Sequence, residues 1–418
     1  MDKLIVRGRC RLEGSVETGG AKNSVLPIMA ASLLCEEDSP CLITSVPSLR
    51  DVEVMGKVLE VLGARVKLQQ GCISIDAGSV SGWEVGNDLA RLLRASNLVM
   101  GPLLGRFRQF RVAKPGGCDI GSRPLDLHIK GFQLLGAEVN FEHGYVEARA
   151  DKLKGADIHL DFPSVGATEN IMMAAATAEG VTIIRNAARE PEIVDLQNFL
   201  NRIRARIRGA GLGVIRIEGV KKLHACDYYG IIPDRIEAGT HMVAGAITGG
   251  DVLVKNVIPE HVEAITAKLK EMGVEVTVFP DAVRVKSTGK LKGTDFRTLP
   301  YPGFPTDMQP QVMALACIAE GTSVITETIF DNRFRHVDEL RCLGANIRIH
   351  GRTAVVRGTR GLSGSRVRAH DLRAAAALVL AGFAADGETI IEGVSHLDRG
   401  YERLEEKYRA IGADMYRV

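Results

Sequence analysis

A cysteine lies in a segment that is unsuited to regular structure. Residues 114–123 read KPGGCDIGSR, and a proline followed by paired glycines disfavours both helix and strand there. Lys114 and Arg123 flank Cys118, and neighbouring cations stabilise a thiolate, although Asp119 acts in the opposite direction. A cysteine without such a setting is most often a small buried hydrophobe. In this flexible loop we interpret Cys118 as a reactive thiol.

Two aspartates each precede an apolar helix. Asp307 and Asp371 stand at positions typical of helix N-caps, and capping is their simplest explanation. A carboxylate at the mouth of a cationic cleft can also accept a proton from a substrate hydroxyl. The residues alone leave both interpretations open.

Basic residues recur at two positions of a repeated unit, each of which is equivalent from copy to copy. One position is the start of an apolar helix, where unpaired N–H groups and the helix dipole attract anions. The other lies 13 residues before a glycine that ends a helix. Arginine matches phosphate or carboxylate with a planar fork, so the pattern predicts a polyanionic ligand such as a phosphorylated acid. A surface ion pair is the simpler explanation for Arg50. The first set is Lys22, Arg94 and Arg373, and the second is Arg50, Arg123 and Arg399.

The unit that positions these residues occurs six times. A helix-end phrase followed by an alternating strand pattern recurs about 70 residues apart, which indicates a repeat architecture. The third copy carries Arg204 where the others have glycine at a left-handed helix end, so we expect either backbone strain or a different cap there. Each unit reads as a buried Ala/Gly-rich helix, a strand, an amphipathic helix and two strands. The phrases begin at residues 61, 134, 202, 271, 342 and 410.

The six units divide into two domains of three. The changeover falls at residues 227–232, after the third unit. We place the first domain at 21–229 and the second at 1–20 plus 230–418, with the N-terminal strand, residues 4–16, completing the last sheet. The chain would then cross twice between the domains, and such a hinge would let them close on a ligand in an active site in the interdomain cleft.

The composition excludes several classes of protein. Lys plus Arg total 53 against 51 for Asp plus Glu, a net charge of +2, so no overall field favours nucleic acid or an anionic membrane. Hydrophobic residues are 45% and charged residues 25%, the balance of an ordinary globular protein. We find neither a secretory signal nor the ~20 apolar residues of a membrane helix. Eight scattered cysteines without C-x-x-C, and ten histidines without H-E-x-x-H, predict neither disulfides nor a zinc site and favour the cytoplasm.

Several longer phrases carry a resemblance to a known family. They are GAKN (20–23), RAS (94–96), PGGCDIGSRPLDLH (115–128), SVGAT (164–168), AAREPEIVD (187–195), FPTDMQ (304–309), DNRF (331–334), DLRA (371–374) and DRGYER (398–403). In this order they resemble the enolpyruvyl transferase family over the whole chain, and within it the branch that acts on UDP-N-acetylglucosamine. The resemblance implies an α/β fold, a two-domain inside-out α/β barrel built from six βαβαββ-type repeats, three per domain, with helix N-termini facing the cleft.

The resemblance also implies a reaction and its residues. Phosphoenolpyruvate would transfer its enolpyruvyl group to the 3-hydroxyl of UDP-N-acetylglucosamine through a tetrahedral intermediate and release phosphate, the first committed step of peptidoglycan precursor synthesis. Cys118 would donate a proton to C3, and it would be the cysteine that fosfomycin alkylates in this family, while Asp307 would take the hydroxyl proton. Neither a metal nor an organic cofactor is implied. Phosphoenolpyruvate would meet Lys22, Asn23, Arg94, Arg123, Arg373 and Arg399, of which Lys22 and Arg399 would also be catalytic. The sugar nucleotide would meet Arg94, Arg123, Pro124, Leu125, Asp126, Leu127, Ser164, Val165, Gly166, Asp307 and Ile329.

A few residues depart from the family pattern or stay outside the predicted site. Phe162 stands where many members have a lysine near the uracil, so contact there would be apolar, and Ala375 stands where a second glycine is usual. We interpret the three histidines near these loops as structural hydrogen-bonding residues; they are His128, His336 and His396.

Two alternative functions compete with this one. Enzymes that act on 3-phosphoshikimate share the fold and phosphoenolpyruvate, but the cysteine loop and the SVGAT phrase favour the sugar nucleotide. The second alternative is a catalytically silent protein that only binds UDP-sugars. Cys118 and Asp307 together argue against it, since a binding module needs neither a thiol nor a base.

Overall fold

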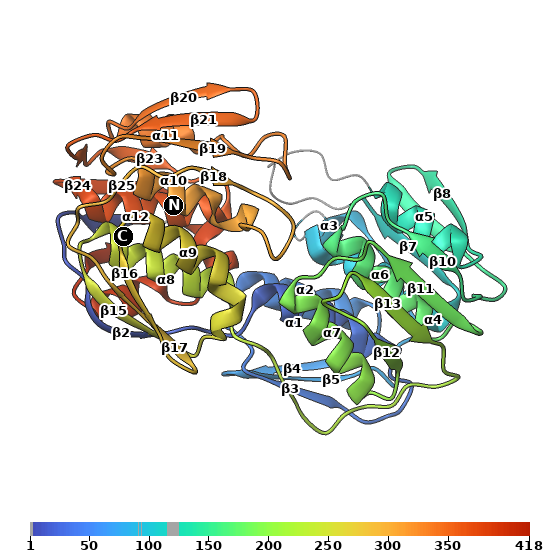
Figure 1. The fold of residues 1–418 in the computed structure, drawn as a ribbon. Coiled ribbons are helices and arrows are strands. Elements are labelled where there is room, and N and C mark those ends of the chain that lie inside the picture. Colours follow the sequence, from blue (N-terminus) through green and yellow to red (C-terminus); the bar gives the residue numbers. More distant parts are fainter. Residues whose placement is uncertain (1–2, 91, 93, 115–124) are drawn as a thin grey trace. The chain divides into compact units, whose positions relative to one another are not determined.

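The chain forms two compact units. A computed structural model describes residues 3–90, 92, 94–114 and 125–418 (Figure 1). Of these, residues 20–114 and 125–232 form the N-terminal unit, and residues 3–19 and 233–418 form the C-terminal unit. Each unit has its own hydrophobic core.

The N-terminal unit contains three four-stranded sheets of one design. In each sheet a short edge strand runs parallel to its neighbour, and the other neighbours are antiparallel. The first sheet has the order β14 (Tyr229–Gly230), β3 (Cys41–Thr44), β5 (Cys72–Asp76) and β4 (Arg65–Gln69). The second is β6 (Glu84–Val85), β7 (Gln109–Ala113), β9 (Tyr145–Arg149) and β8 (Glu138–Glu142). The third is β10 (Asp157–His159), β11 (Val181–Arg185), β13 (Val214–Glu218) and β12 (Arg206–Arg208).

The C-terminal unit repeats this design three times. Its first sheet is β2 (Glu13–Glu17), β15 (Asp251–Lys255), β17 (Ala282–Lys286) and β16 (Glu275–Val278). The second is β18 (Phe296–Arg297), β19 (Thr322–Thr326), β21 (Thr353–Arg357) and β20 (Asn346–His350). The third is β23 (Arg366–Arg368), β25 (Glu388–Glu392), β1 (Lys3–Arg7) and β26 (Asp414–Arg417). A small parallel pair, β22 (Leu362–Ser363) with β24 (Ala385–Asp386), accompanies it.

The N-terminal segment differs from the single strand expected at residues 4–16. It forms two strands, β1 and β2, which belong to different sheets. β1 pairs antiparallel with both β25 and β26, so it supplies the strand that the sixth repeat lacks. β2 pairs with β15 as the parallel edge strand of the fourth repeat. The first strand of the chain thereby joins the last repeat, while the second joins the repeat that opens the C-terminal unit.

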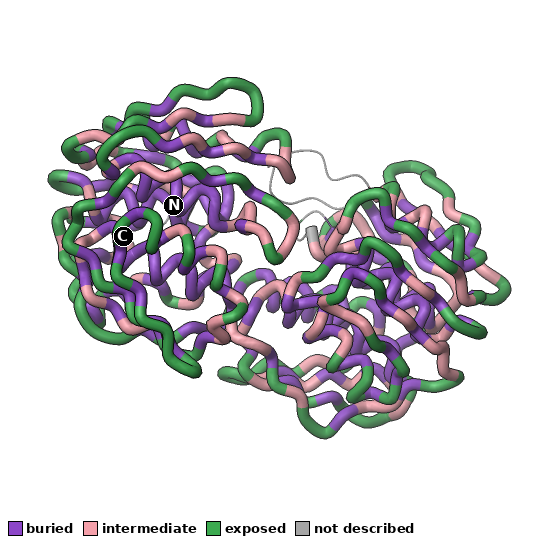
Figure 2. The backbone as a smooth tube through the Cα atoms, in the orientation of Figure 1, coloured by how far each residue is buried: buried purple, intermediate pink, exposed green. Residues whose placement is uncertain are grey.

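Apolar helices fill the centre of each unit, and the sheets lie outside them (Figure 2). Every residue of α8 is buried, including Glu237, Thr240 and His241, as expected for a central helix that is covered on all sides. Small residues allow close packing: a Cβ on Gly101 would lie 2.4 Å from the carbonyl oxygen of Asn170. The inside-out arrangement predicted from the sequence is therefore confirmed. The central helices are α1 (Lys22–Ala31), α4 (Met100–Phe107) and α6 (Val165–Ala175) in the N-terminal unit, and α8 (Arg235–Ile247), α10 (Gln309–Ala316) and α12 (Leu372–Ala384) in the C-terminal unit.

A second helix in each repeat has one buried and one exposed face. These helices are α2 (Arg50–Val61), α5 (Asp126–Leu134), α7 (Pro191–Arg202), α9 (Glu263–Glu271), α11 (Val337–Cys342) and α13 (Leu404–Arg409). Short helices complete the connections: η1 (Ser32–Leu34), α3 (Asn87–Ala90), η2 (Arg94–Val99), η3 (Pro259–Val262), η4 (Thr306–Met308) and η5 (Val394–Arg399). Among the described residues, no helix combines the length and the apolar character that crossing a membrane requires.

The left-handed helix ends of the repeats confirm the expected strain at Arg204. Its φ is +81°, in the region that glycine adopts freely and other L-residues avoid. The equivalent residues are glycines with positive φ: Gly63, Gly136, Gly273, Gly344 and Gly412. The third repeat has thus kept the turn but not the residue that suits it.

Replacing Arg204 by glycine should stabilise the N-terminal unit. The left-handed conformation costs an L-residue about 1–2 kcal/mol, and the extra freedom of glycine in the unfolded chain offsets part of this gain. Arg204 is exposed, so few contacts are lost. We expect Arg204→Gly to raise the free energy of unfolding by about 0.5–1 kcal/mol in denaturant titrations. The control Arg208→Gly, which lies in β12, should lower it; a loss of stability in both variants would contradict the strain argument.

Candidate active site

A lysine and an aspartate meet at the start of the first central helix. Lys22 opens α1, and its Nζ lies 2.8 Å from Oδ2 of Asp51, the second residue of α2. The Asp51 side chain is buried, whereas that of Lys22 remains 14% exposed. Asn23 follows on α1 and is half-buried. The ammonium is therefore held in place by a buried carboxylate, while part of the lysine side chain stays exposed.

Asp51 is a site residue that the sequence analysis misses, although it directly follows Arg50. Arg50 opens α2 and is exposed, which agrees with the surface role preferred for it. The sequence did contain a signal for Asp51. An aspartate in the first turn of a helix is stabilised by the helix dipole and can pair with a nearby cation.

Two predicted nucleotide-binding segments come together through a histidine. His128 lies on α5, directly after Leu125, Asp126 and Leu127, and its Nδ1 is 3.2 Å from Nδ2 of Asn170 on α6. The His128 ring also lies beside Gly166, because a Cβ on that glycine would come within 3.2 Å of its Cε1. The structural role expected for His128 is confirmed.

Ser164 caps the helix that carries the second of these segments. Its hydroxyl accepts a hydrogen bond from the backbone N–H of Ala167 at 3.4 Å, and Val165 and Gly166 form the first turn of α6. Ser164, Val165 and Gly166 are all half-buried. Nearby Phe162 is 42% exposed, so an apolar surface borders this helix start.

In the C-terminal unit, two buried arginines hold Asp307. Its Oδ1 accepts from Nη2 of Arg333 and its Oδ2 from Nη2 of Arg373, each at 3.0 Å. The Asp307 side chain is 29% exposed, against 2% for Arg333 and 5% for Arg373. Burial alone would lower the pKa of Arg373, but Asp307, Tyr401 and Asp234 together outweigh it and raise the pKa, so this guanidinium stays charged. The result is a partly accessible carboxylate between two fixed cations.

The two predicted capping aspartates have different roles. Asp371 is an N-cap: its Oδ1 accepts from the backbone N–H groups of Arg373 at 2.8 Å and Ala374 at 3.0 Å. Asp307 lies within η4, and the structure gives the following α10 no side-chain cap. Capping is therefore the wrong explanation for Asp307, which caps neither helix and instead accepts from the two arginines.

A buried tyrosine joins Arg373 to the other central helices. The Tyr401 hydroxyl accepts from Nη1 of Arg373 at 3.3 Å and from Nε2 of Gln311 at 3.4 Å, and it lies 2.9 Å from Oγ1 of Thr240. These partners come from α12, α10 and α8. Arg399 ends η5 two residues before Tyr401 and is half-buried. Arg333 and Tyr401 lie in the DNRF and DRGYER phrases, but sequence spacing alone assigned them no contact.

Other predicted residues fall outside the described part of the chain. Cys118, Arg123 and Pro124 lie there, and the structure describes the backbone of Arg94 but not its side chain. Ile329 is described and half-buried, in the turn after β19.

Cys317 behaves as the buried hydrophobe expected, since burial raises the pKa of its thiol to about 12. Among the described His, Cys, Asp and Glu residues, no group of three or more could hold a metal ion.

His336 is a buried, neutral group beside this cluster. Its imidazole forms a hydrogen bond with the backbone of Arg333, as expected for a structural residue, whereas its Nε2 has no hydrogen-bond partner in the described structure. Burial lowers the pKa of His336 to about 4, while Asp371 opposes the shift and Arg333 adds to it. The imidazole is therefore neutral near pH 7.

Protonation of His336 should destabilise the fold as the pH falls. Its pKa is lower in the folded than in the unfolded chain, so its contribution to stability is complete above about pH 6.5 and is lost toward pH 4. We expect His336→Gln to flatten the dependence of the free energy of unfolding on pH in this window. The exposed control His143→Gln should follow the unaltered protein, and an unchanged slope in His336→Gln would contradict the assignment.

Comparison with known proteins decides the family. A sequence model of EPSP synthase (3-phosphoshikimate 1-carboxyvinyltransferase) matches residues 6–408. The chain belongs to this family, the enolpyruvyl transferases. The resemblance found in the sequence is confirmed.

Relatives within the enolpyruvyl transferases show the same overall build. A UDP-N-acetylglucosamine 1-carboxyvinyltransferase 1 from Carboxydothermus hydrogenoformans is 56% identical over 418 residues, covering 100% of this chain and 99% of that protein. One of the same name from Caldanaerobacter subterraneus subsp. tengcongensis is 55% identical, over 99% of both chains. The solved structure of the enolpyruvyl transferase NikO from Streptomyces tendae matches with a TM-score of 0.89 and 26% identity, covering 100% of this chain and 99% of that chain. An EPSP synthase from Acinetobacter baumannii shares the fold, with a TM-score of 0.76 and 20% identity over the same shares.

Proposed function

We propose that this chain transfers the enolpyruvyl group of phosphoenolpyruvate to the 3-hydroxyl of UDP-N-acetylglucosamine and releases phosphate. This would be the first committed step of peptidoglycan precursor synthesis, and we place it in the cytoplasm. The observation that carries the proposal is the partly exposed Asp307 held between Arg333 and Arg373 in a chain 56% identical to an enzyme named for this activity.

Asp307 is the proposed general base. Its carboxylate takes the proton of the sugar 3-hydroxyl as that oxygen bonds to C2 of phosphoenolpyruvate, and Cys118 delivers a proton to C3. Loss of a proton from C3 and of phosphate from C2 then restores the double bond. The guanidinium pair fixes the orientation of the carboxylate, which places the base before the reaction begins.

The cations of the site stabilise the charges of phosphoenolpyruvate. Asp51 holds the Lys22 ammonium at the start of α1. These fixed charges would stabilise the tetrahedral intermediate and the leaving phosphate without reorganising in the transition state. Beside Lys22, we assign to this ligand Asn23, Arg94, Arg123, Arg373 and Arg399.

A second set of residues would bind the sugar nucleotide. Leu125, Asp126 and Leu127 with the Ser164–Gly166 turn form one surface, which His128 and Asn170 hold together. Exposed Phe162 would give the uracil an apolar contact. We assign to the same ligand Ile329, Arg94, Arg123, Pro124 and Asp307.

Phosphate release with two acceptors tests the proposal. We expect release from phosphoenolpyruvate with UDP-N-acetylglucosamine and none with 3-phosphoshikimate. Asp307→Asn keeps the shape but removes the base, so kcat should fall by about 100-fold or more, and Cys118→Ala should also lose most activity. The exposed residues Asp338 and Cys342 provide matched controls, Asp338→Asn and Cys342→Ala, which should stay active.

Other results of the phosphate-release assay would contradict parts of the proposal. Release with 3-phosphoshikimate would overturn the substrate. A folded protein that is silent with both acceptors but binds UDP-N-acetylglucosamine in calorimetry would favour the binding protein without catalysis. Full activity in Asp307→Asn would overturn the role of this residue as the base.

A further inference from the structure

A buried glutamate outside the predicted site receives four hydrogen bonds. Glu327 directly follows β19 and is 1% exposed. Its Oε1 accepts from Oγ1 of Thr298 and from the backbone N–H of Ile329, each at 2.8 Å, and from the N–H of Phe330 at 3.2 Å. Its Oε2 accepts from Oγ1 of Thr306 at 2.9 Å. Charged acceptors form strong hydrogen bonds, so the Glu327 carboxylate holds the segments of its four donors in fixed positions.

The four donors belong to three separate segments. Thr298 directly follows β18, Thr306 opens η4 immediately before Asp307, and Ile329 begins the turn after β19. The Glu327 carboxylate therefore links the segment that carries Asp307, the proposed base, to the turn that carries Ile329, a proposed nucleotide contact. Thr298 strengthens the tie, because its hydroxyl also accepts from the backbone N–H of Thr328 at 2.9 Å.

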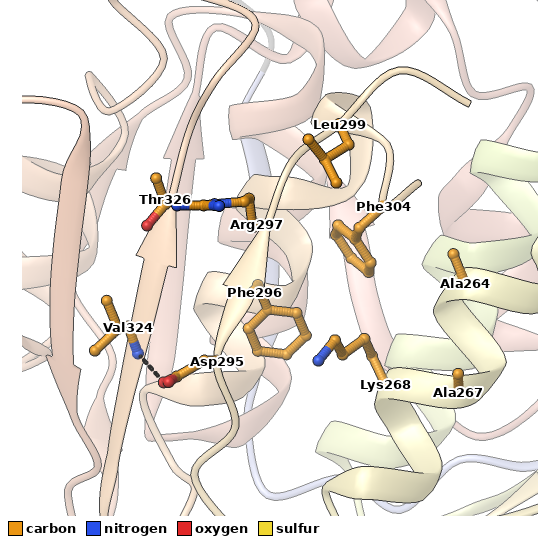
Figure 3. A pocket seen from close by; sticks show the side chains of 10 residues that line it. All are labelled: Ala264, Ala267, Lys268, Asp295, Phe296, Arg297, Leu299, Phe304, Val324 and Thr326. Carbon is orange, nitrogen blue, oxygen red and sulfur yellow. Dashed lines mark hydrogen bonds between the residues drawn. The ribbon is translucent and has the colours of Figure 1, made fainter. Parts of the chain in front are cut away.

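The segment that leads to Asp307 borders a pocket. Leu299 and Phe304 flank the turn between Thr298 and Thr306, and both line a pocket of about 490 Å³ (Figure 3). Phe296 and the α9 residue Lys268 form other parts of its wall. A side chain that borders a hollow loses part of the dispersion contacts that would fix it. Phe304 itself is buried against Phe296, so this packing and the polar contacts with Glu327 together fix the position of the turn.

We infer that Glu327 is a positioning residue, which sets the Asp307 carboxylate relative to the nucleotide-binding turn at Ile329. This inference rests on the proposed function, in which Asp307 must reach one hydroxyl of a sugar whose nucleotide is held elsewhere. A shift of the base by a fraction of an ångström lowers the rate of proton transfer without removing any group that contacts phosphoenolpyruvate.

Thr306→Val tests the inference with little change of volume. The variant removes only the bond from Thr306 to Glu327, so we expect kcat to fall about tenfold, with the KM for phosphoenolpyruvate unchanged. Thr306→Ser restores the hydroxyl and should recover most of kcat. Thr353→Val is the matched control, because Thr353 lies in β21 of the same sheet and its hydroxyl is 3.5 Å from that of Thr326. It should retain kcat.

Substitution of Glu327 itself provides a second test. Glu327→Gln keeps an oxygen that can accept from three of the donors, and its amide can donate to the hydroxyl of Thr306, so most of kcat should remain. Glu327→Ala leaves the donors without an acceptor, and it should lower kcat and raise the Kd for UDP-N-acetylglucosamine in calorimetry. If Glu327→Ala does not fold, Thr306→Val and Thr306→Ser still decide the question.

The outcomes distinguish this inference from the proposed function. A kcat within about twofold of the unaltered protein in Thr306→Val would overturn the role of Glu327 alone. An equal loss in Thr306→Val and Thr353→Val would overturn it as well, because the effect would then be general. An unaltered protein that releases no phosphate would overturn the proposed function and, with it, this role.

Discussion

The central helices are buried on nearly every face, and this constraint shapes both units. A helix such as α8, buried along its whole length, cannot lie on a surface, so three sheets must cover the helices of each unit. Polar side chains inside these helices, such as Thr240 and Gln311, are buried and hydrogen-bonded. The charged residues of the site lie at the helix starts, where N–H groups are unpaired. Lys22, Asp307 and Asp371 all stand at or just before such ends. The packing that stabilises the fold thus also gathers the residues of the site.

Charge balance explains why Asp307 is fixed between two buried arginines. Two buried guanidinium groups would be costly without an anion, and the Asp307 carboxylate meets both of them. Asp234 also raises the pKa of Arg373, so more than one carboxylate balances the two guanidinium groups. Tyr401 links Arg373 to the neighbouring central helices, so this charge arrangement is part of the core.

The two chain crossings between the units are anchored at the start of α8. Gly19 ends the first segment of the C-terminal unit, and Lys22 opens α1 three residues later. The Gly19 N–H donates to Oε2 of Glu237 at 2.8 Å, and its carbonyl accepts from the N–H of Asp234 at 2.9 Å. Lys407 balances Glu237, with its Nζ 2.6 Å from Oε1. The C-terminal unit thus holds the chain firmly just before the helix that carries Lys22.

Local patterns were enough to predict the repeat, the order of elements and the helix starts that carry Lys22 and Arg373, because periodicity, small residues and caps act between near neighbours. They also indicated the strain at Arg204, since five other copies supplied the comparison. The contacts of Asp307 with Arg333 and Arg373 emerge only in the folded chain, because these partners are 26 and 66 residues away. The same holds for the four donors around Glu327 and for the split of residues 4–16 between two sheets. Such contacts depend on which distant segments pack together, and no local pattern encodes that.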